Sequence, residues 1–344
     1  MKFFNLFILF ILTIVLANCG GDKKSKISSF TIELVGKKSS FQLGESVSLE
    51  IKNPKGKTID SVQFSLEGRS ILETFSITDQ KLGEKILTAT VFSEGNVEKT
   101  TKKVTLLSNT APKIYTFHVL NEFPHDRDAF TQGLEFYNGY LYEGTGQRGR
   151  SSLRKIDHTK GEILKQVALS ERYFGEGITI LNDKLYQLTW QSKTGFVYDP
   201  ETLEKLSSFA YGKSREGWGL CNDGKVIYKS DGTEKIWTLD PETLVEKGFI
   251  QIYTNKAKIK SVNELEYANG KIYANIWQKN GVAVIDPSNG AVEAVVDFSA
   301  LKKRVTQHDN LDVLNGVAYN PDTNTFFVTG KNWDKLFEVE IVVE

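Results

Sequence analysis

A short pattern occurs five times between residues 131 and 317 of the 344-residue chain, and one of its positions changes in chemical type from copy to copy. The copies are Thr131-Gln132-Gly133-Leu134, Phe174-Gly175-Glu176-Gly177-Ile178, Gly217-Trp218-Gly219-Leu220, Val262-Asn263-Glu264-Leu265 and Leu314-Asn315-Gly316-Val317. In four of the five copies a Gly precedes an apolar residue, while the residue before it is an amide, a carboxylate or an indole. A repeat that keeps its frame but varies at one position predicts a site assembled from that position, with Glu176 at its centre.

A second position varies in the same way further along each repeat. Fourteen residues after the variable position the chain reaches Gly146, Trp190, Gly232 and Trp277, and in the last copy Lys331 follows after 16 residues. Phe130 and Phe174 lie two residues before Gln132 and Glu176, so strand alternation would point them the same way. Aromatic walls around a few polar groups are typical of a pocket for a small organic ligand.

The elements that must position these residues are short strands. Each repeat, of about 40 to 50 residues, reads as a strand, a turn, a second strand containing an aromatic residue, a third strand ending near Asp-Pro, and a fourth strand. Asn138-Gly139 and Asn269-Gly270 are strong hairpin signals. Four antiparallel strands in each of five units predict an all-β fold, a five-bladed β-propeller over residues 109–344. The last unit lacks a fourth strand, and Ile114–Leu120 is predicted to supply it.

Residues 28–108 form a separate β-rich segment. Alternation of apolar and polar residues in Phe30-Ile32-Leu34, Val47-Leu49-Ile51 and Val62-Phe64-Leu66 predicts short strands. This spacing favours a small immunoglobulin-like β-sandwich domain ahead of the propeller. We interpret it as a spacer, and a carbohydrate- or partner-binding module is the alternative.

The first 27 residues read as an export signal. Lys2 is followed by an apolar run from Phe3 to Ala17, which is short for a membrane span but suits a secretory signal. The run ends in Leu16-Ala17-Asn18-Cys19, as in a bacterial lipoprotein signal. Residues 1–18 are therefore predicted to be removed, Cys19 to be lipidated, and residues 19–27 to form a tether. This predicts a cell-envelope protein lipid-anchored to a membrane, periplasmic or at the cell surface; a plain signal peptide or an uncleaved anchor is the alternative.

Composition and residue spacing argue against several other classes. Lys plus Arg and Asp plus Glu number 43 each, a balance that disfavours nucleic acid as a partner. The four histidines, His118, His125, His158 and His308, fit no metal-ligand spacing and are expected at the surface or at strand ends. Cys221 reads as a core residue. No metal site is predicted, although Asp231, Asp309 and Asp312 could help to hold a structural Ca²⁺.

These motifs together resemble a known family. The resemblance rests on Phe130-Thr131-Gln132-Gly133-Leu134, Phe174-Gly175-Glu176-Gly177-Ile178, Leu188-Thr189-Trp190, Glu216-Gly217-Trp218-Gly219, Val262-Asn263-Glu264-Leu265-Glu266, Asn275-Ile276-Trp277 and Asn315-Gly316-Val317-Ala318. In this order they are similar to the glutaminyl-peptide cyclotransferases of the plant and bacterial type, over about residues 115–343. The resemblance does not cover the signal or the sandwich.

The resemblance implies an enzyme on a five-bladed propeller that converts N-terminal glutamine to pyroglutamate and releases ammonia without a metal or other cofactor. Glu176 would be the catalytic acid/base group. The substrate-binding residues would be Gln132, Asn263 and Lys331 as polar contacts and Phe130, Phe174, Trp190, Trp218 and Trp277 as walls. The expected partners are peptides or proteins with N-terminal Gln, together with a membrane through the Cys19 lipid, for a protein that is a monomer.

Two other functions remain open from the residues alone. The first is a non-catalytic ligand- or partner-binding propeller at the cell surface, which would bind without forming product. The second is a metal-dependent hydrolase of the lactonase type, with Glu176, Asn263 and Asn315 around one ion. Two tryptophans and a lysine at the second variable position make a poor ion shell, so this reading ranks last.

Overall fold

The computed structural model describes residues 28–342, whose regular secondary structure is almost wholly β-strand. A single 3-10 turn, Leu301–Lys303, is the exception among them. The predicted signal, the lipidated Cys19 and the tether lie outside the described residues. No helix in the described part is long and apolar enough to cross a membrane.

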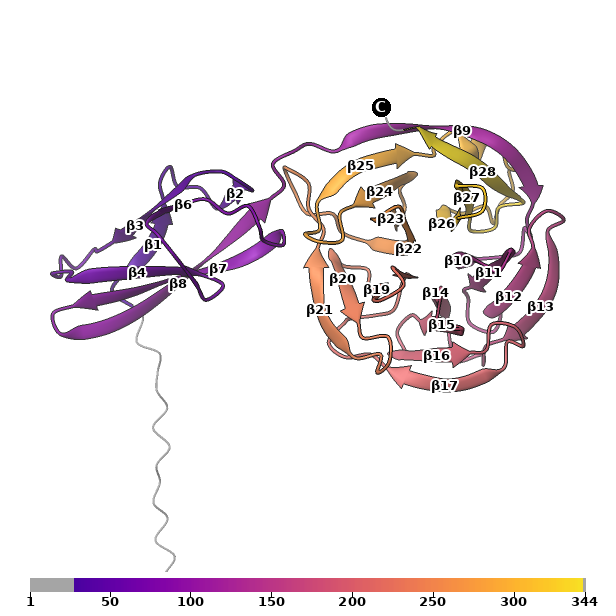
Figure 1. Cartoon of the computed structure of the whole chain (residues 1–344), viewed down its shortest axis with the longest axis horizontal. Helices are drawn as coiled ribbons and strands as arrows, with labels where there is room; N and C mark the ends of the chain where they lie inside the picture. Colours follow the sequence, from indigo (N-terminus) through magenta and orange to yellow (C-terminus); the bar gives the residue numbers. More distant parts are fainter. Residues whose placement is uncertain (1–27, 343–344) are drawn as a thin grey trace, which may run out of the picture.

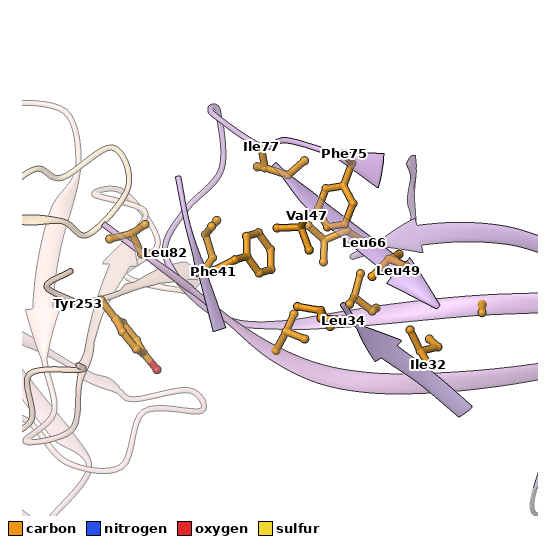
Figure 2. Close-up of a cluster of buried hydrophobic side chains, with 14 of the residues drawn as sticks. Ile32, Leu34, Phe41, Val47, Leu49, Leu66, Phe75, Ile77, Leu82 and Tyr253 are labelled. Carbon is orange, nitrogen blue, oxygen red and sulfur yellow. The ribbon is translucent and has the colours of Figure 1, made fainter. Parts of the chain in front are cut away.

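Residues 31–107 form two sheets that share one core. The first sheet has the order β1 (Thr31–Leu34), β3 (Val47–Lys52), β6 (Thr74–Phe75), and the second has β2 (Ser40–Gln42), β8 (Asn96–Leu107), β7 (Gly83–Ser93), β4 (Ser61–Leu66), β5 (Arg69–Ile71). Alternate residues such as Leu34, Leu49 and Leu66 meet between the sheets (Figure 2). The period-2 pattern therefore predicted the inward faces correctly, while the short strands β2, β5 and β6 had too few residues to show it.

This two-sheet unit is attached to the rest of the protein by specific contacts. Tyr253 from the second part of the chain joins its buried cluster near Leu82 (Figure 2). The Glu84 N–H donates to Gln251 Oε1 at 2.9 Å, and the Leu82 N–H donates to the Asn289 carbonyl at 2.8 Å. Hydrogen bonds at two points beside a shared apolar contact therefore hold the two-sheet unit against the second part of the chain.

Residues 113–342 form a ring of antiparallel sheets (Figure 1). Three sheets have four strands each, in chain order. The first contains β10 (Thr131–Tyr137), β11 (Tyr140–Thr145), β12 (Ser152–Asp157) and β13 (Glu162–Ala168), and the second contains β14 (Gly175–Leu181), β15 (Lys184–Thr189), β16 (Thr194–Tyr198) and β17 (Lys205–Ala210). The third contains β18 (Leu220–Asn222), β19 (Ile227–Ser230), β20 (Lys235–Leu239) and β21 (Glu246–Gln251). An eight-stranded sheet contains β22 (Val262–Ala268), β23 (Lys271–Ile276), β24 (Gly281–Ile285), β25 (Val292–Asp297), then β9 (Lys113–Pro124), β28 (Lys335–Val342), β27 (Thr325–Gly330) and β26 (Leu314–Asn320).

The start and the end of this region are joined in the eight-stranded sheet. β9 pairs antiparallel with β28 from Thr116 to Pro124, and its first residues pair parallel with β25. The prediction that Ile114–Leu120 supplies the strand missing from the last repeat is confirmed, and the strand extends beyond that prediction to Pro124.

The first strands of the five repeats contact one another in a closed cycle. β10 contacts β14 and β26, β18 contacts β14 and β22, and β22 contacts β26. The repeated Gly permits this close approach. A Cβ on Gly177 would lie 2.6 Å from Gly219 Cα, and one on Gly219 would lie 2.1 Å from the Asn263 carbonyl oxygen. A Gly at this position of the repeat is thus required sterically for the first strands to pack closely at the centre of the ring.

His125 directly follows the end of β9, so it lies at a strand end, one of the two places expected for the histidines. Its side chain is nevertheless only 4% exposed and lies 3.1 Å from the Glu143 carboxylate. Glu143 also accepts a hydrogen bond from Thr131 at 2.7 Å and pairs with Arg154 at 3.4 Å. Burial disfavours the charged imidazole, but Glu143 outweighs this and raises the pKa of His125. Partners on separate strands cannot be read from local sequence.

The steric role of the central glycines can be tested with Gly219→Ala. We expect it to lower the free energy of unfolding by about 1–3 kcal/mol, because the methyl group must displace neighbouring backbone rather than a flexible side chain. Urea unfolding measures this. The control is Gly248→Ala, where a Cβ would meet only Thr238 Oγ1 at 3.8 Å. Equal stability of both variants would contradict the account.

Candidate functional site

A cavity of about 500 Å³ opens at one end of the ring, where the first strands begin and the second strands end. All nine residues predicted for the site line this cavity: Phe130, Gln132, Phe174, Glu176, Trp190, Trp218, Asn263, Trp277 and Lys331. They come from all five repeats. Asn315, the first-position residue of the last repeat, does not line the cavity but is hydrogen-bonded to Asn263 and Gln132, which do. The two variable positions of the repeat thus converge as predicted.

Glu176 is the most unusual group in the cavity. It lies in β14, and only 3% of the residue is exposed. Its Oε2 is buried and has no hydrogen-bond partner among the described residues. Removal from water raises the pKa of this carboxyl well above its ordinary value, and the nearby Glu216 charge raises it further, whereas Lys331 lowers it. A buried carboxyl with an unused oxygen and a raised pKa is a better proton acceptor than an ordinary carboxylate and can also return the proton.

Lys331 is the basic counterpart of Glu176. It follows β27, is 4% exposed, and its Nζ lies 4.6 Å from the centroid of the Phe130 ring. Burial lowers the pKa of this amine, and the Glu176 and Asp312 charges partly oppose that shift. The two side chains do not form a direct ion pair within 4.0 Å among the described residues. Space for a ligand group therefore remains between a carboxyl and an amine that influence one another.

A chain of amides crosses the site from one side to the other. Asn263 Nδ2 donates to Asn315 Oδ1 at 2.9 Å, and Asn315 Nδ2 donates to Gln132 Oε1 at 3.1 Å and to the Thr131 carbonyl at 2.9 Å. These bonds fix the orientation of both outer amides. Gln132 Nε2 and Asn263 Oδ1 are not used in this chain, so one donor and one acceptor face a ligand.

The aromatic wall is held by a single carboxylate. Glu216 Oε2 accepts hydrogen bonds from Trp190 Nε1 at 2.6 Å and from Trp218 Nε1 at 2.8 Å. A buried indole N–H requires such a partner. Trp218 also packs edge-to-face with Trp277, with ring centroids 5.9 Å apart. Glu216 therefore sets the position of two walls of the cavity.

Glycines at the second variable position make room for these rings. A Cβ on Gly232 would lie 2.5 Å from the Trp218 ring, and one on Gly146 would lie 2.4 Å from the Phe174 ring. The ring that fills the space at Gly232 is Trp218, the first-position residue of the same repeat, and the ring at Gly146 is Phe174 of the next repeat. The change between Gly, Trp and Lys at the second variable position therefore reflects how much space the aromatic rings beside it occupy.

Five further lining residues were missed by the sequence analysis: Gln191, Arg215, Glu216, Asp231 and Ser261. A signal for two of them was present. Glu216 and Ser261 lie two residues before Trp218 and Asn263, the same offset that pointed to Phe130 and Phe174. Asp231 is held by Trp237 Nε1 at 2.8 Å and by Thr233 Oγ1 at 2.5 Å. Across residues 28–342 there is no group of three or more His, Cys, Asp or Glu side chains placed to hold a metal ion.

The fold and the cavity define a class: a ring of β-sheets with a buried carboxyl, a buried amine and oriented amides inside aromatic walls. Comparison with known proteins identifies the family. The sequence model of the glutamine cyclotransferase family matches residues 86–341, and the chain belongs to this family. The match begins within β7, so it includes the last two strands of the N-terminal unit.

Two relatives show the extent of the similarity. The glutaminyl-peptide cyclotransferase of Arabidopsis thaliana is 39% identical over 232 residues, which are 67% of this chain and 72% of that protein. The crystal structure of Myxococcus xanthus glutaminyl cyclase matches with a TM-score of 0.63 and 35% identity, covering 68% of this chain and 100% of that one.

The burial of Glu176 predicts a cost in stability. Because its folded pKa is raised, the folded state holds a proton more tightly than the unfolded state, and stability falls as the pH rises above the ordinary carboxyl value of 4.5. Glu176→Gln should therefore stabilise the protein by ~1–3 kcal/mol at pH 8, the scale for an unsatisfied buried polar group, and by much less at pH 4.

Urea unfolding at the two pH values measures the effect. Glu204→Gln is the matched control, since that carboxylate is exposed and its replacement should leave the pH dependence unchanged. A Glu176→Gln variant that is less stable than the wild type at pH 8 would mean that the carboxylate has a stabilising partner.

Proposed function

We propose that this chain is a glutaminyl-peptide cyclotransferase, converting the N-terminal glutamine of peptides and proteins to pyroglutamate with release of ammonia. Membership of the glutamine cyclotransferase family supports this activity. The single observation that carries the mechanism is the buried Glu176 carboxyl, whose Oε2 has no hydrogen-bond partner within residues 28–342, beside oriented polar groups in an aromatic cavity.

The reaction is a transfer within one molecule. The α-amine nitrogen of the substrate attacks the carboxamide carbon of the same glutamine side chain, a C–N bond forms, and the bond to the side-chain nitrogen breaks. The amine loses a proton and the departing nitrogen gains one, so the overall proton balance is zero. Because both reacting groups are on one residue, holding it folded supplies much of the rate.

In this account, Glu176 takes the proton from the attacking amine and returns it to the leaving ammonia. Its raised pKa suits both roles near neutral pH, because a carboxyl of ordinary pKa would be a weak base and would hold no proton to return. Lys331 is placed to stabilise negative charge that develops on the amide oxygen. The donor of Gln132 and the acceptor of Asn263 orient the carboxamide and the amine.

The aromatic wall has two functions in this proposal. Phe130, Phe174, Trp190, Trp218 and Trp277 would exclude water from the folded glutamine side chain, which strengthens the interactions of the polar groups inside. They also keep Glu176 desolvated, and so maintain the pKa on which the proton transfers depend. Glu216 acts through the two tryptophans and through its charge.

We further propose that the ring is a five-bladed β-propeller of residues 109–344 and that residues 28–108 are an immunoglobulin-like β-sandwich spacer. Support comes from the five repeats and from the closed cycle of first strands. The signal in residues 1–18, the lipidated Cys19 and the tether in residues 19–27 remain sequence-based proposals. With them, we propose a protein anchored in the cell envelope, and we propose separately that it is a monomer.

Mass spectrometry of a Gln-initiated peptide incubated with the protein, with and without EDTA, tests the activity. We expect loss of one ammonia only when Gln is the first residue, with the same rate in chelator. Absence of product above the uncatalysed control would favour the non-catalytic binding protein. Product formation that EDTA abolishes would favour a metal-dependent site.

Glu176→Gln tests the central assignment. We expect kcat to fall by at least ~10²-fold, the usual contribution of a general acid/base group, with the cavity intact because the two side chains have nearly the same shape. Steady-state kinetics by ammonia release measures this, and Glu204→Gln is the control. Wild-type turnover in the Glu176→Gln variant would move the proton transfers to another group.

The pH profile tests the electrostatics independently. Glu216→Gln removes a charge that raises the pKa of Glu176, so the acid limb of kcat/KM should move to lower pH. Lys331→Met removes a charge that lowers this pKa, so the limb should move to higher pH in whatever activity remains. Because the substrate is the same throughout, a shift belongs to the enzyme. Limbs that coincide in all three proteins would contradict the role of Glu176 as the base.

A further inference from the structure

The mouth of the cavity is formed by loops of two kinds. These are the loops that lead into the first strands and the turns that join second to third strands, which the antiparallel order places at the same end. Four of these loops supply lining residues near the opening: Gln191, Arg215, Ser261 and Trp277. Trp277 is 43% exposed, so this is where a peptide chain would leave the cavity.

Each of these four loops also carries a basic side chain facing solvent. We name this set the basic arc: Lys193, Lys213, Arg215, Lys260 and Lys279, all exposed. Lys260 adjoins Ser261, while Lys193 and Lys279 are two residues from Gln191 and Trp277. With about 3.8 Å between consecutive Cα atoms, their backbones lie within about 8 Å of the lining residues.

The charges of the basic arc are largely unused within the protein. In the described part of the chain Lys193, Lys213, Lys260 and Lys279 have no carboxylate within ion-pair distance, and Arg215 meets Glu216 only at 3.6 Å. Three acidic groups nearby are already engaged. Glu216 accepts from two indoles, Asp231 from Trp237 and Thr233, and Glu234 lies 3.9 Å from Lys258.

The opposite end of the ring has the reverse character. Its turns between third and fourth strands begin with carboxylates at Asp157, Asp199, Asp240 and Asp286. Several of these cap the turns; Asp199 Oδ1, for example, accepts from the Thr202 N–H at 2.7 Å. The exposed acidic side chains Asp128, Glu171 and Asp309 are on other loops of the mouth end, which also carry exposed Arg127, Arg148, Arg150 and Arg172, whereas the four loops of the arc carry exposed basic charges alone. The neutral net charge therefore hides a separation of charge along the ring.

We propose that the basic arc binds carboxylates of the substrate downstream of its N-terminal glutamine, so that the preferred substrates are peptides and proteins with acidic residues close behind that glutamine. This inference rests on the proposed function. An extended chain advances about 3.3–3.6 Å per residue, which carries the third to fifth residues over the arc once the first is in the cavity. The interaction is solvent-exposed, so it acts on encounter and binding, and salt screens it.

Matched peptides test the proposal. The probes are Gln-Ala-Glu-Glu-Ala, Gln-Ala-Gln-Gln-Ala and Gln-Ala-Lys-Lys-Ala, each amidated at its end. We expect kcat/KM to be about fivefold higher for the acidic than for the neutral peptide, the scale of a few exposed ion pairs, and lower again for the basic peptide. The difference between the acidic and the neutral peptide should lie in KM. The ratio of their kcat/KM values should fall toward one as NaCl is raised from about 0.02 M to about 0.5 M.

A pair of double variants assigns the effect to the arc. Lys260→Gln with Lys279→Gln should reduce the acidic preference at low salt to about twofold or less. Lys184→Gln with Lys225→Gln removes the same charge from exposed positions at the opposite end and should keep the wild-type ratio. Turnover of the neutral peptide shows that the cyclase itself works, so a failure of the preference is distinct from a failure of the proposed function.

Two results would overturn the proposal. One is equal kcat/KM for the three peptides at low salt. The other is a preference that both double variants retain, since the arc would then not be its source. If the peptides are equal but the protein sediments with vesicles containing phosphatidylglycerol and not with phosphatidylcholine vesicles, the arc recognises an anionic membrane instead, and the peptide proposal is wrong.

Discussion

The close approach of the first strands at the centre of the ring is the constraint on which the rest of the structure depends. Five first strands meet in a closed cycle, and they come so close that backbone faces backbone at their contacts. Gly133, Gly177 and Gly219 permit this approach, because a Cβ on any of them would lie under 3.0 Å from an atom of a neighbouring strand. The residue before each of these glycines is then forced to the same end of the cycle. An amide (Gln132), a carboxylate (Glu176) and an indole (Trp218) from distant parts of the chain thereby come within one cavity.

The chemistry follows from what this arrangement leaves unsatisfied. The amides bond to one another and the indoles bond to Glu216, but Glu176 is removed from water without a hydrogen-bond partner for Oε2 in the described part of the protein. The protein accepts a loss of stability at this point, as is common at functional sites. The result is a carboxyl whose proton affinity is balanced between desolvation, the Glu216 charge and Lys331.

The repeat made most of the site predictable, because residues at equivalent positions of equivalent strands must lie at one end of a ring. The nine predicted lining residues followed from the two variable positions of the repeat, from strand alternation for Phe130 and Phe174, and from the resemblance to the family. Glu216 was missed because its importance arises from two indole N–H groups in different repeats, Trp190 and Trp218. The burial of His125 was not predicted because its partner Glu143 lies on another strand. In the N-terminal unit, β2, β5 and β6 have two or three residues each, too few for periodicity to show.

The ionisation of Glu176 in the substrate-free protein tests this account most directly. Carbon-13 NMR of protein labelled at the glutamate carboxyl carbons, with Glu176→Gln to assign the signal, would follow its titration. The account predicts that this signal titrates well above pH 4.5, and that it moves down in Glu216→Gln and up in Lys331→Met. A Glu176 carboxyl that titrates at or below pH 4.5 would contradict it, because the group would then be too weak a base for the proton transfers assigned to it.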